Sequence, residues 1–250
     1  MVPNAAIFGC EGPVLTSWEQ DFFSRTRPLG FILFARNCES PDQVRTLVSA
    51  LRGCLGRPDA PVLIDQEGGR VARLKPPHWR AAPAAGRFGA LAARNREQAC
   101  AAVATNARLL AAELSELGIS VDCAPVLDLP APGADGVIGD RALGRDPELI
   151  ALLGRAFCEG LLQGGIMPVI KHVPGHGRAK VDSHRTAPIV EAAQAELERT
   201  DFEPFRALAD APWAMTAHVT FTAIDRENPA TVSSRVIAEV IRGFIGFDGV

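Results

Sequence analysis

The stretch Pro61-Val62-Leu63-Ile64-Asp65 decides the fold, because an unbroken apolar run leads directly into a carboxylate. Such a run is typical of a parallel strand that is buried on both faces. The same pattern recurs where Asp128 follows residues 124–127 and where Lys171 follows residues 167–170. Polar residues at the ends of several apolar strands predict a sheet whose carboxyl edge carries a binding site.

Short apolar runs alternate with helical segments along the whole chain. Thr16 and Glu19 form a capping box, and Ser40-Pro41-x-Gln43 combines an N-cap with Pro at the first helical position. Strands are predicted at residues 6–8, 31–34, 61–65, 120–127, 167–172 and 213–219, and a further strand begins at residues 247–250. Helices are also predicted at residues 95–117, 147–163, 191–209 and 234–242, with Gly118 as a C-cap.

This alternation predicts an α/β protein with a parallel sheet covered by helices. The first strand is not followed by a Gly-rich dinucleotide-binding turn, which favours a (β/α)8 TIM-type barrel over a Rossmann sheet. We expect residues 1–250 to form a single barrel domain. Because the last strand only begins at residue 247, we also expect the barrel to be incomplete at the C-terminal end of this sequence.

Composition narrows the class of protein. The net charge is −3 and no run of Lys or Arg occurs, so a nucleic-acid partner is not expected. The first fifteen residues contain no Lys or Arg, and no apolar stretch approaches the roughly 18 residues of a membrane span. The six cysteines are scattered without a CxxC pair, as reduced thiols of a cytoplasmic protein would be. We therefore expect a cytoplasmic protein without a membrane partner.

Two connections, at residues 74–91 and 173–190, are unusually long and both follow strands. The second follows Lys171-His172 and contains Asp182-Ser183-His184. A carboxylate beside an imidazole fixes its tautomer and favours its protonated form, which suits a group that first donates and later accepts a proton. A hydrogen bond that merely stabilises the loop would give the same spacing.

A metal site is the rival interpretation of this segment. His172, His176, Asp182 and His184 are four possible ligands within thirteen residues, and barrel hydrolases often hold zinc with His and Asp. Pro174-Gly175 interrupts the spacing that would place both histidines on one helix face.

The motifs together resemble those of bacterial β-N-acetylglucosaminidases of glycoside hydrolase family 3. The resemblance covers essentially the whole chain in the right order. It rests on residues 30–37 (GFILFARN), 65–73 (DQEGGRVAR), 124–128 (APVLD), 139–147 (GDRALGRDP), 171–177 (KHVPGHG) and 182–184 (DSH).

The resemblance implies a role for each matching residue. His184 would be the general acid/base and Asp182 its partner, in place of one carboxylate of the usual glycosidase pair. The sugar would be bound by Asp65, Arg73, Arg141, Lys171 and His172. Arg70 and Glu67 are interpreted as structural parts of their loop. Asp128 and His218 are equally well explained as second-layer or core polar residues, so neither is counted among the catalytic residues.

The resemblance also implies a reaction and its setting. We expect a retaining exo-β-N-acetylglucosaminidase that removes terminal N-acetylglucosamine from peptidoglycan-derived muropeptides during cell-wall recycling. We expect a monomer that uses neither a cofactor nor a metal ion. The nucleophilic carboxylate is expected just beyond Val250, and Asp248 should not be taken for it. The alternatives are a sugar-binding protein that lacks the nucleophile and a metal-dependent barrel hydrolase.

Overall fold

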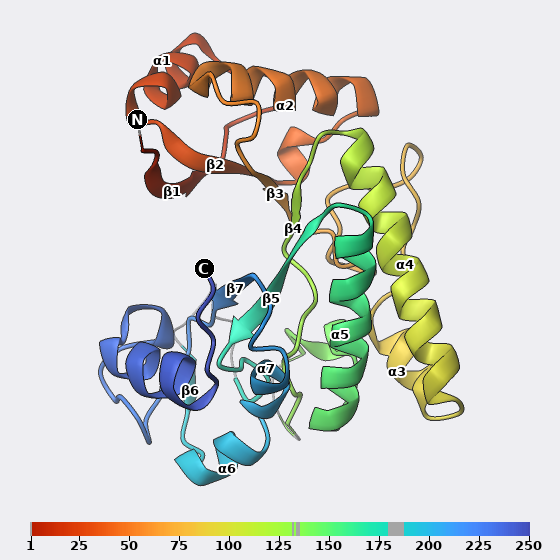
Figure 1. The fold of residues 1–250 in the computed structure, drawn as a ribbon, viewed down its shortest axis with the longest axis vertical. Coiled ribbons are helices and arrows are strands. Elements are labelled where there is room, and N and C mark those ends of the chain that lie inside the picture. The colour runs from red at the N-terminus through yellow and green to blue at the C-terminus, as the bar shows by residue number, and fades with distance from the viewer. Residues whose placement is uncertain (1, 132, 134–135, 180–187) are drawn as a thin grey trace.

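The computed structural model describes residues 2–131, 133, 136–179 and 188–250. One six-stranded parallel sheet runs in chain order through β1 (Asn4–Phe8), β2 (Pro28–Leu33), β3 (Val62–Ile64), β4 (Val121–Asp122), β5 (Met167–Val173) and β7 (Trp213–Thr216). Figure 1 shows this sheet curling from β1 to β7 as half of a barrel. The α/β class and the parallel order are as predicted, whereas the described residues form no closed barrel.

Helices cover the outer side of the curled sheet (Figure 1). They are α1 (Ser17–Thr26), α2 (Pro41–Leu55), α3 (Gly86–Ala92), α4 (Arg96–Glu116), α5 (Pro147–Gln163), α6 (Gln194–Arg199) and α7 (Glu203–Ala207). Single turns of 3-10 helix occur at η1 (Ala35–Asn37), η2 (Gly139–Arg141) and η3 (Ala230–Val232), and η4 (Val236–Phe244) is π-helical. Two short strands, β6 (Ile189–Val190) and β8 (Thr220–Phe221), pair in parallel as a separate small sheet.

The strands are apolar on both faces because each face is packed. Phe31 and Ile64 belong to the large core between sheet and helices. Leu63, Val121 and Val169 belong to a second cluster on the other face of the same strands. This arrangement explains why the strand sequences read as continuous apolar runs rather than alternating ones.

The predicted helix signals are confirmed by the caps. Thr16 and Glu19 bond reciprocally as a capping box, and Ser40 Oγ accepts a hydrogen bond from the backbone N–H of Gln43. Helix α5 spans the predicted residues, and α4 differs from its prediction by one residue at each end. Gly118 adopts φ +77°, the left-handed conformation expected at a helix end.

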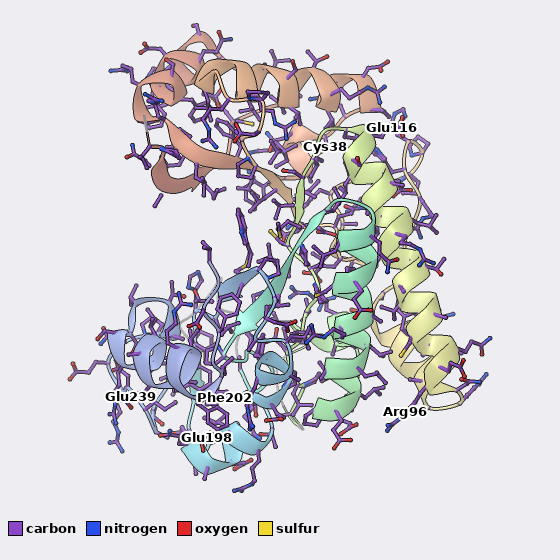
Figure 2. The ribbon with its side chains drawn as sticks, in the orientation of Figure 1. Cys38, Arg96, Glu116, Glu198, Phe202 and Glu239 are labelled. Carbon is purple, nitrogen blue, oxygen red and sulfur yellow. The ribbon has the colours of Figure 1, made fainter. Side chains whose placement is uncertain are left out.

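The predicted helix at residues 191–209 is wrong as a single element. It consists of α6 and α7, separated around Thr200. Pro204 has no N–H to bond the carbonyl of Thr200, so one helix cannot run through it; it lies instead in the first turn of α7, where no such bond is needed. Phe202, between the two helices in the chain, packs into the core. Figure 2 shows it between α6 and η4, and its ring centroid lies 5.8 Å from that of Phe221.

Further elements also differ from the prediction. Strand β7 ends at Thr216, short of residue 219, and the helix predicted at residues 234–242 is the π-helical η4 (Val236–Phe244). Strand β4 ends at Asp122, short of residue 127, because Pro125 lacks an N–H for a regular ladder. Helix α3 lies inside the connection predicted to be a loop at residues 74–91. Residues 247–250 form no strand, although Val250 exchanges backbone hydrogen bonds with Pro212 and Ala214 at the start of β7.

Among the described residues, none of the helices combines the length and the apolar character that crossing a bilayer would require.

Candidate active site

A buried lysine links two carboxylates at the carboxyl ends of β3 and β5. Lys171, the fifth residue of β5, places Nζ 2.7 Å from Asp65 Oδ1 and 2.6 Å from Glu67 Oε1. Asp65 directly follows β3, and Glu67 lies two residues further along the same loop. The Lys171 side chain is only 1% exposed, so this ammonium is held almost entirely by protein carboxylates.

Two arginines extend the network from distant segments. Arg73 Nη2 lies 3.0 Å from Asp65 Oδ2. Arg141, at the end of η2, donates from Nε and Nη2 to the two carboxylate oxygens of Glu67 at 2.9 and 2.8 Å. This fork-to-carboxylate pairing fixes orientation as well as charge. Three cations therefore surround two carboxylates at one edge of the sheet.

The network keeps its members charged. Burial alone would raise the pKa of Asp65, but Lys171 and Arg73 outweigh it and hold that pKa below the ordinary value. Burial would likewise raise the pKa of Glu67, and Arg141 and Lys171 lower it instead. Burial would lower the pKa of Lys171, but Glu67 and Asp65 raise it. Both carboxylates are thus anions and Lys171 is a cation at neutral pH.

A histidine pair lies beside this network and is organised by one aspartate. Asp128 accepts from the backbone N–H of His172 at 3.2 Å and from that of His176 at 2.7 Å, and His172 Nδ1 lies 2.7 Å from its Oδ2. Asp128 is fully buried, and His172 and His176 hold its pKa below the ordinary value against the effect of burial. Because Asp128 occupies Nδ1 of His172, Nε2 of that ring remains for a ligand.

The predicted sugar-binding residues are brought together by the fold. Asp65, Arg73 and Lys171 form one connected set, Arg141 joins it through Glu67, and His172 follows Lys171 in the chain. The side chains of Asp65, Arg73 and His172 remain 14%, 26% and 18% exposed, enough to meet a ligand. The predicted catalytic residues Asp182 and His184 lie outside the described residues.

Two members of the site were underestimated from the sequence. Glu67 was interpreted as a structural loop residue, yet it joins Lys171 to Arg141. Asp128 is not counted among the catalytic residues on the basis of the sequence, yet its carboxylate holds Nδ1 of the His172 ring. The usable signal was position, since Asp128 follows an apolar strand as Asp65 does. The partners of Glu67 could not be found from the sequence, because Arg141 is 74 positions away.

Arg70 and His218, the other two polar residues discussed in the sequence analysis, form contacts outside the charged network. Arg70 bonds Asp140 at 2.9 Å and the carbonyl of Gly136, so it ties its loop to the segment that carries Arg141. His218 is exposed and its Nδ1 lies 2.8 Å from Thr231 Oγ1.

Of the four possible metal ligands, His172 and His176 belong to the described residues, and Asp182 and His184 do not. The rings of His172 and His176 lie 5.6 Å apart, and Nδ1 of His172 is already paired with Asp128. Over the described parts of the chain, no three His, Cys, Asp or Glu side chains are grouped as metal ligands would be.

The site thus combines fixed anions and cations at the carboxyl ends of parallel strands. Carboxylates accept hydrogen bonds from hydroxyls, whereas guanidinium and imidazole groups donate to hydroxyl and carbonyl oxygens. Such a set has the donors and acceptors to orient a polar, polyhydroxylated ligand. Charged side chains at the carboxyl edge of a curled parallel sheet are typical of barrel-type enzymes that act on polar substrates.

Comparisons with known proteins agree with this class. Residues 22–250 match the glycosyl hydrolase family 3 N-terminal domain. The chain is 41% identical over 251 residues to a β-hexosaminidase from Alkalilimnicola ehrlichii, covering all of this chain and 71% of that protein. A β-hexosaminidase from Bordetella avium is 35% identical, with 99% and 71% covered.

Solved structures give the same result. Native NagZ from Neisseria gonorrhoeae superposes with a TM-score of 0.91 at 34% identity, covering all of this chain and 74% of that one. The same enzyme in complex with N-trifluoroacetyl-D-glucosamine gives a TM-score of 0.92. The chain belongs to glycoside hydrolase family 3 and corresponds to its N-terminal domain. Its relatives are β-hexosaminidases, and it is a glycoside hydrolase of that type.

Proposed function

We propose that the protein is a retaining exo-β-N-acetylglucosaminidase. The observation that carries this proposal is the Asp65–Lys171–Glu67–Arg141 network, with Arg73 and His172 beside it, at the carboxyl edge of the sheet. A similar structure holds N-trifluoroacetyl-D-glucosamine, an analogue of the sugar proposed here. A terminal sugar ring in this pocket would meet both acceptors and donors.

Sugar binding would use the accessible members of the pocket. Asp65 would accept hydrogen bonds from ring hydroxyls, and its ionised state makes those bonds stronger than neutral ones. Arg73 would donate to the opposite hydroxyls and to the acetamido oxygen, and His172 would form its hydrogen bond to the sugar through Nε2, because Asp128 holds its Nδ1. Lys171, which is nearly inaccessible, would act mainly by holding Asp65 and Glu67 in place.

Proton transfer is assigned to His184 with Asp182 as its partner. This part of the proposal rests on the sequence motif DSH at residues 182–184 and its resemblance to the family motif. The acid/base must protonate the leaving oxygen and then activate water, and an imidazole near neutral pKa can do both.

A retaining mechanism also needs a carboxylate nucleophile. Asp65 and Glu67 are poor candidates for the nucleophile, because each carboxylate forms an ion pair with Lys171 and a second ion pair with an arginine. Mass spectrometry after reaction with an activated 5-fluoro N-acetylglucosaminyl fluoride would identify the labelled peptide. Labelling of the peptide that contains Asp65 would contradict this assignment.

The proposed substrates are muropeptides that carry a terminal β-linked N-acetylglucosamine, hydrolysed by a monomer in the cytoplasm during cell-wall recycling. This part of the proposal rests on the resemblance of the motifs to bacterial β-N-acetylglucosaminidases.

The deciding experiment is hydrolysis of 4-nitrophenyl N-acetyl-β-glucosaminide by the protein expressed from its complete reading frame. Activity should survive EDTA, fall sharply in His184→Ala, and release the β-anomer first in an NMR time course. Release of the α-anomer would exclude retention. Loss of activity with EDTA would point to a metal-dependent hydrolase, and saturable binding without turnover would point to a sugar-binding protein.

A further inference from the structure

A buried carboxyl group lies beside the network, and no salt bridge to it occurs among the described residues. Asp122, the last residue of β4, is fully buried. Its Oδ1 accepts a hydrogen bond from the backbone N–H of Gln66 at 3.0 Å, whereas its Oδ2 has no hydrogen-bond partner in the described part of the chain. The bond connects β4 to the residue that directly follows Asp65.

The side chain of Gln66 in turn forms hydrogen bonds with the far end of the loop after β3, at Arg73 and Leu74. Its Oε1 accepts from the backbone N–H groups of Arg73 at 2.9 Å and Leu74 at 3.0 Å, and its Nε2 donates to the carbonyl of Leu74. The side chain of Gln66 is completely buried. One residue thus joins both ends of the loop that supplies Asp65, Glu67 and Arg73, and Asp122 fixes that residue from the neighbouring strand.

We propose that Asp122 is a positioning residue for the sugar pocket and that it works as a neutral carboxylic acid. The inference rests on the proposed function of this pocket. An ionised Asp122 would add a buried negative charge near Asp65 and Glu67, whose own charges are already paired with the three cations of the network. In either protonation state Oδ2 lacks a hydrogen-bond partner among the residues that the structure describes, but a buried hydroxyl costs far less free energy than a buried charge.

The surrounding charges support the neutral form. Burial raises the pKa of Asp122 to about 7; the Gln66 N–H and Lys171 oppose this rise, and Asp65 and Glu67 reinforce it. Asp65, Gln66 and Glu67 belong to the loop after β3 and Lys171 belongs to β5, and Cys123 directly follows Asp122 in the chain. Ionisation of Asp122 above neutral pH would therefore disturb the carboxylates that bind the sugar.

The test compares wild type with Asp122→Asn and Asp122→Ala, each expressed from the complete reading frame, with 4-nitrophenyl N-acetyl-β-glucosaminide from pH 5 to 9. Asn keeps the acceptor oxygen for Gln66 but cannot ionise, whereas Ala removes the acceptor. At pH 6 the Asn variant should keep kcat/KM within about threefold of wild type, and the Ala variant should lose about tenfold or more, chiefly through KM. Above pH 7 the decline of kcat/KM should be weaker in the Asn variant than in wild type.

The control is Glu113→Gln on α4, another carboxyl whose pKa is raised by burial but which lies outside the pocket. Its pH profile should match wild type. Asn and Ala variants that are equally impaired, with an unchanged alkaline decline, would overturn the neutral role. An Ala variant with wild-type KM and pH profile would overturn the positioning role. Asp122→Ser replaces the Ala variant if that variant fails to fold.

A measurement independent of turnover separates this inference from the proposed function. A carboxyl that is neutral in the folded state but ionised in the unfolded chain loses its stabilising effect as pH rises from about 4 towards 7. The urea midpoint of Asp122→Asn should therefore rise relative to wild type between pH 5 and pH 8. An unchanged difference would overturn the inference, whether or not the wild type hydrolyses the substrate.

Discussion

At the scale of single residues, the site depends on charges that neutralise one another out of contact with water. Lys171 carries two carboxylate partners, and Glu67 carries two cationic ones. Removing one member of such a set leaves the others buried and uncompensated, which costs more than the set contributes when intact. Substitutions within this network should therefore affect folding and ligand binding together.

Glu67→Gln is the sharpest test of that coupling. It removes the charge that Arg141 and Lys171 share, so the free energy of unfolding should fall by about 3 kcal/mol and KM should rise about tenfold. Urea unfolding and substrate titration would measure both. Glu116→Gln is the matched control, because Glu116 lies at the end of α4 with a side chain 75% exposed and pairs only loosely with Arg45 (Figure 2). It should change stability by less than about 0.5 kcal/mol; equal effects would contradict the network's importance.

Asp128→Asn tests the orientation of His172. The substitution keeps the shape but replaces an anionic acceptor of the His172 and His176 N–H groups with a neutral amide. The imidazole of His172 should then lose its preferred tautomer, and kcat/KM should fall about tenfold. The ¹⁵N chemical shifts of Nδ1 and Nε2 of His172, measured by NMR, report which nitrogen carries the proton, and they should change in the variant. Unaltered shifts and rates would show that Asp128 does not control this ring.

At the scale of elements, close contacts between helices explain several glycines. A Cβ on Gly160 of α5 would lie 2.6 Å from the carbonyl of Ala104 and 2.7 Å from Cβ of Ala107, both on α4. Gly53 of α2 has open space at the same position and an ordinary helical conformation. The two positions are therefore a matched pair of helical glycines with opposite surroundings.

Gly160→Ala should destabilise the protein by about 1–3 kcal/mol, because the two helices must separate. Gly53→Ala should stabilise it by up to about 1 kcal/mol, because alanine restricts the unfolded chain and favours the helix. Thermal and urea unfolding would measure both. A neutral Gly160→Ala would show that α4 and α5 can shift without loss.

The elements also show how far the sequence alone could go. Caps and periodicity predicted α5 and nearly all of α4, because those signals are local. Pro204 indicates the break between α6 and α7, but the Ala, Leu, Glu and Arg residues on both sides favour one continuous helix. In the site, strand-end positions pointed to Asp65 and Lys171, whereas the roles of Glu67 and Asp122 depend on partners that only folding brings near.

At the scale of the whole molecule, opposite pKa shifts predict a stability maximum. Asp65, Glu67 and Asp128 have lowered pKa values, so their stabilising effect is present above their unfolded pKa of about 4 and is lost as pH falls. Asp122 has a raised pKa of about 7, so its effect is lost as pH rises towards that value. The contribution of these four groups to stability should therefore peak between about pH 4 and 5.

Urea midpoints measured from pH 3 to 9 would test this expectation. Glu67→Gln should flatten the acid side of the curve, and Asp122→Asn should flatten the alkaline side. A wild-type midpoint that keeps rising from pH 5 to pH 8 would show that other groups dominate the proton linkage.

The enclosure of Lys171 has a consequence for chemical labelling. The chain contains three lysines, at positions 75, 171 and 180, and Lys75 is exposed whereas Lys171 is 1% exposed and doubly ion-paired. Acylating reagents attack the uncharged amine, so a lysine locked as an ammonium and shielded from solvent resists them. The rate of acylation at Lys171 therefore measures how often the protein opens locally and exposes this amine to solvent. Acylation of the exposed Lys75 serves as the internal reference for reagent activity.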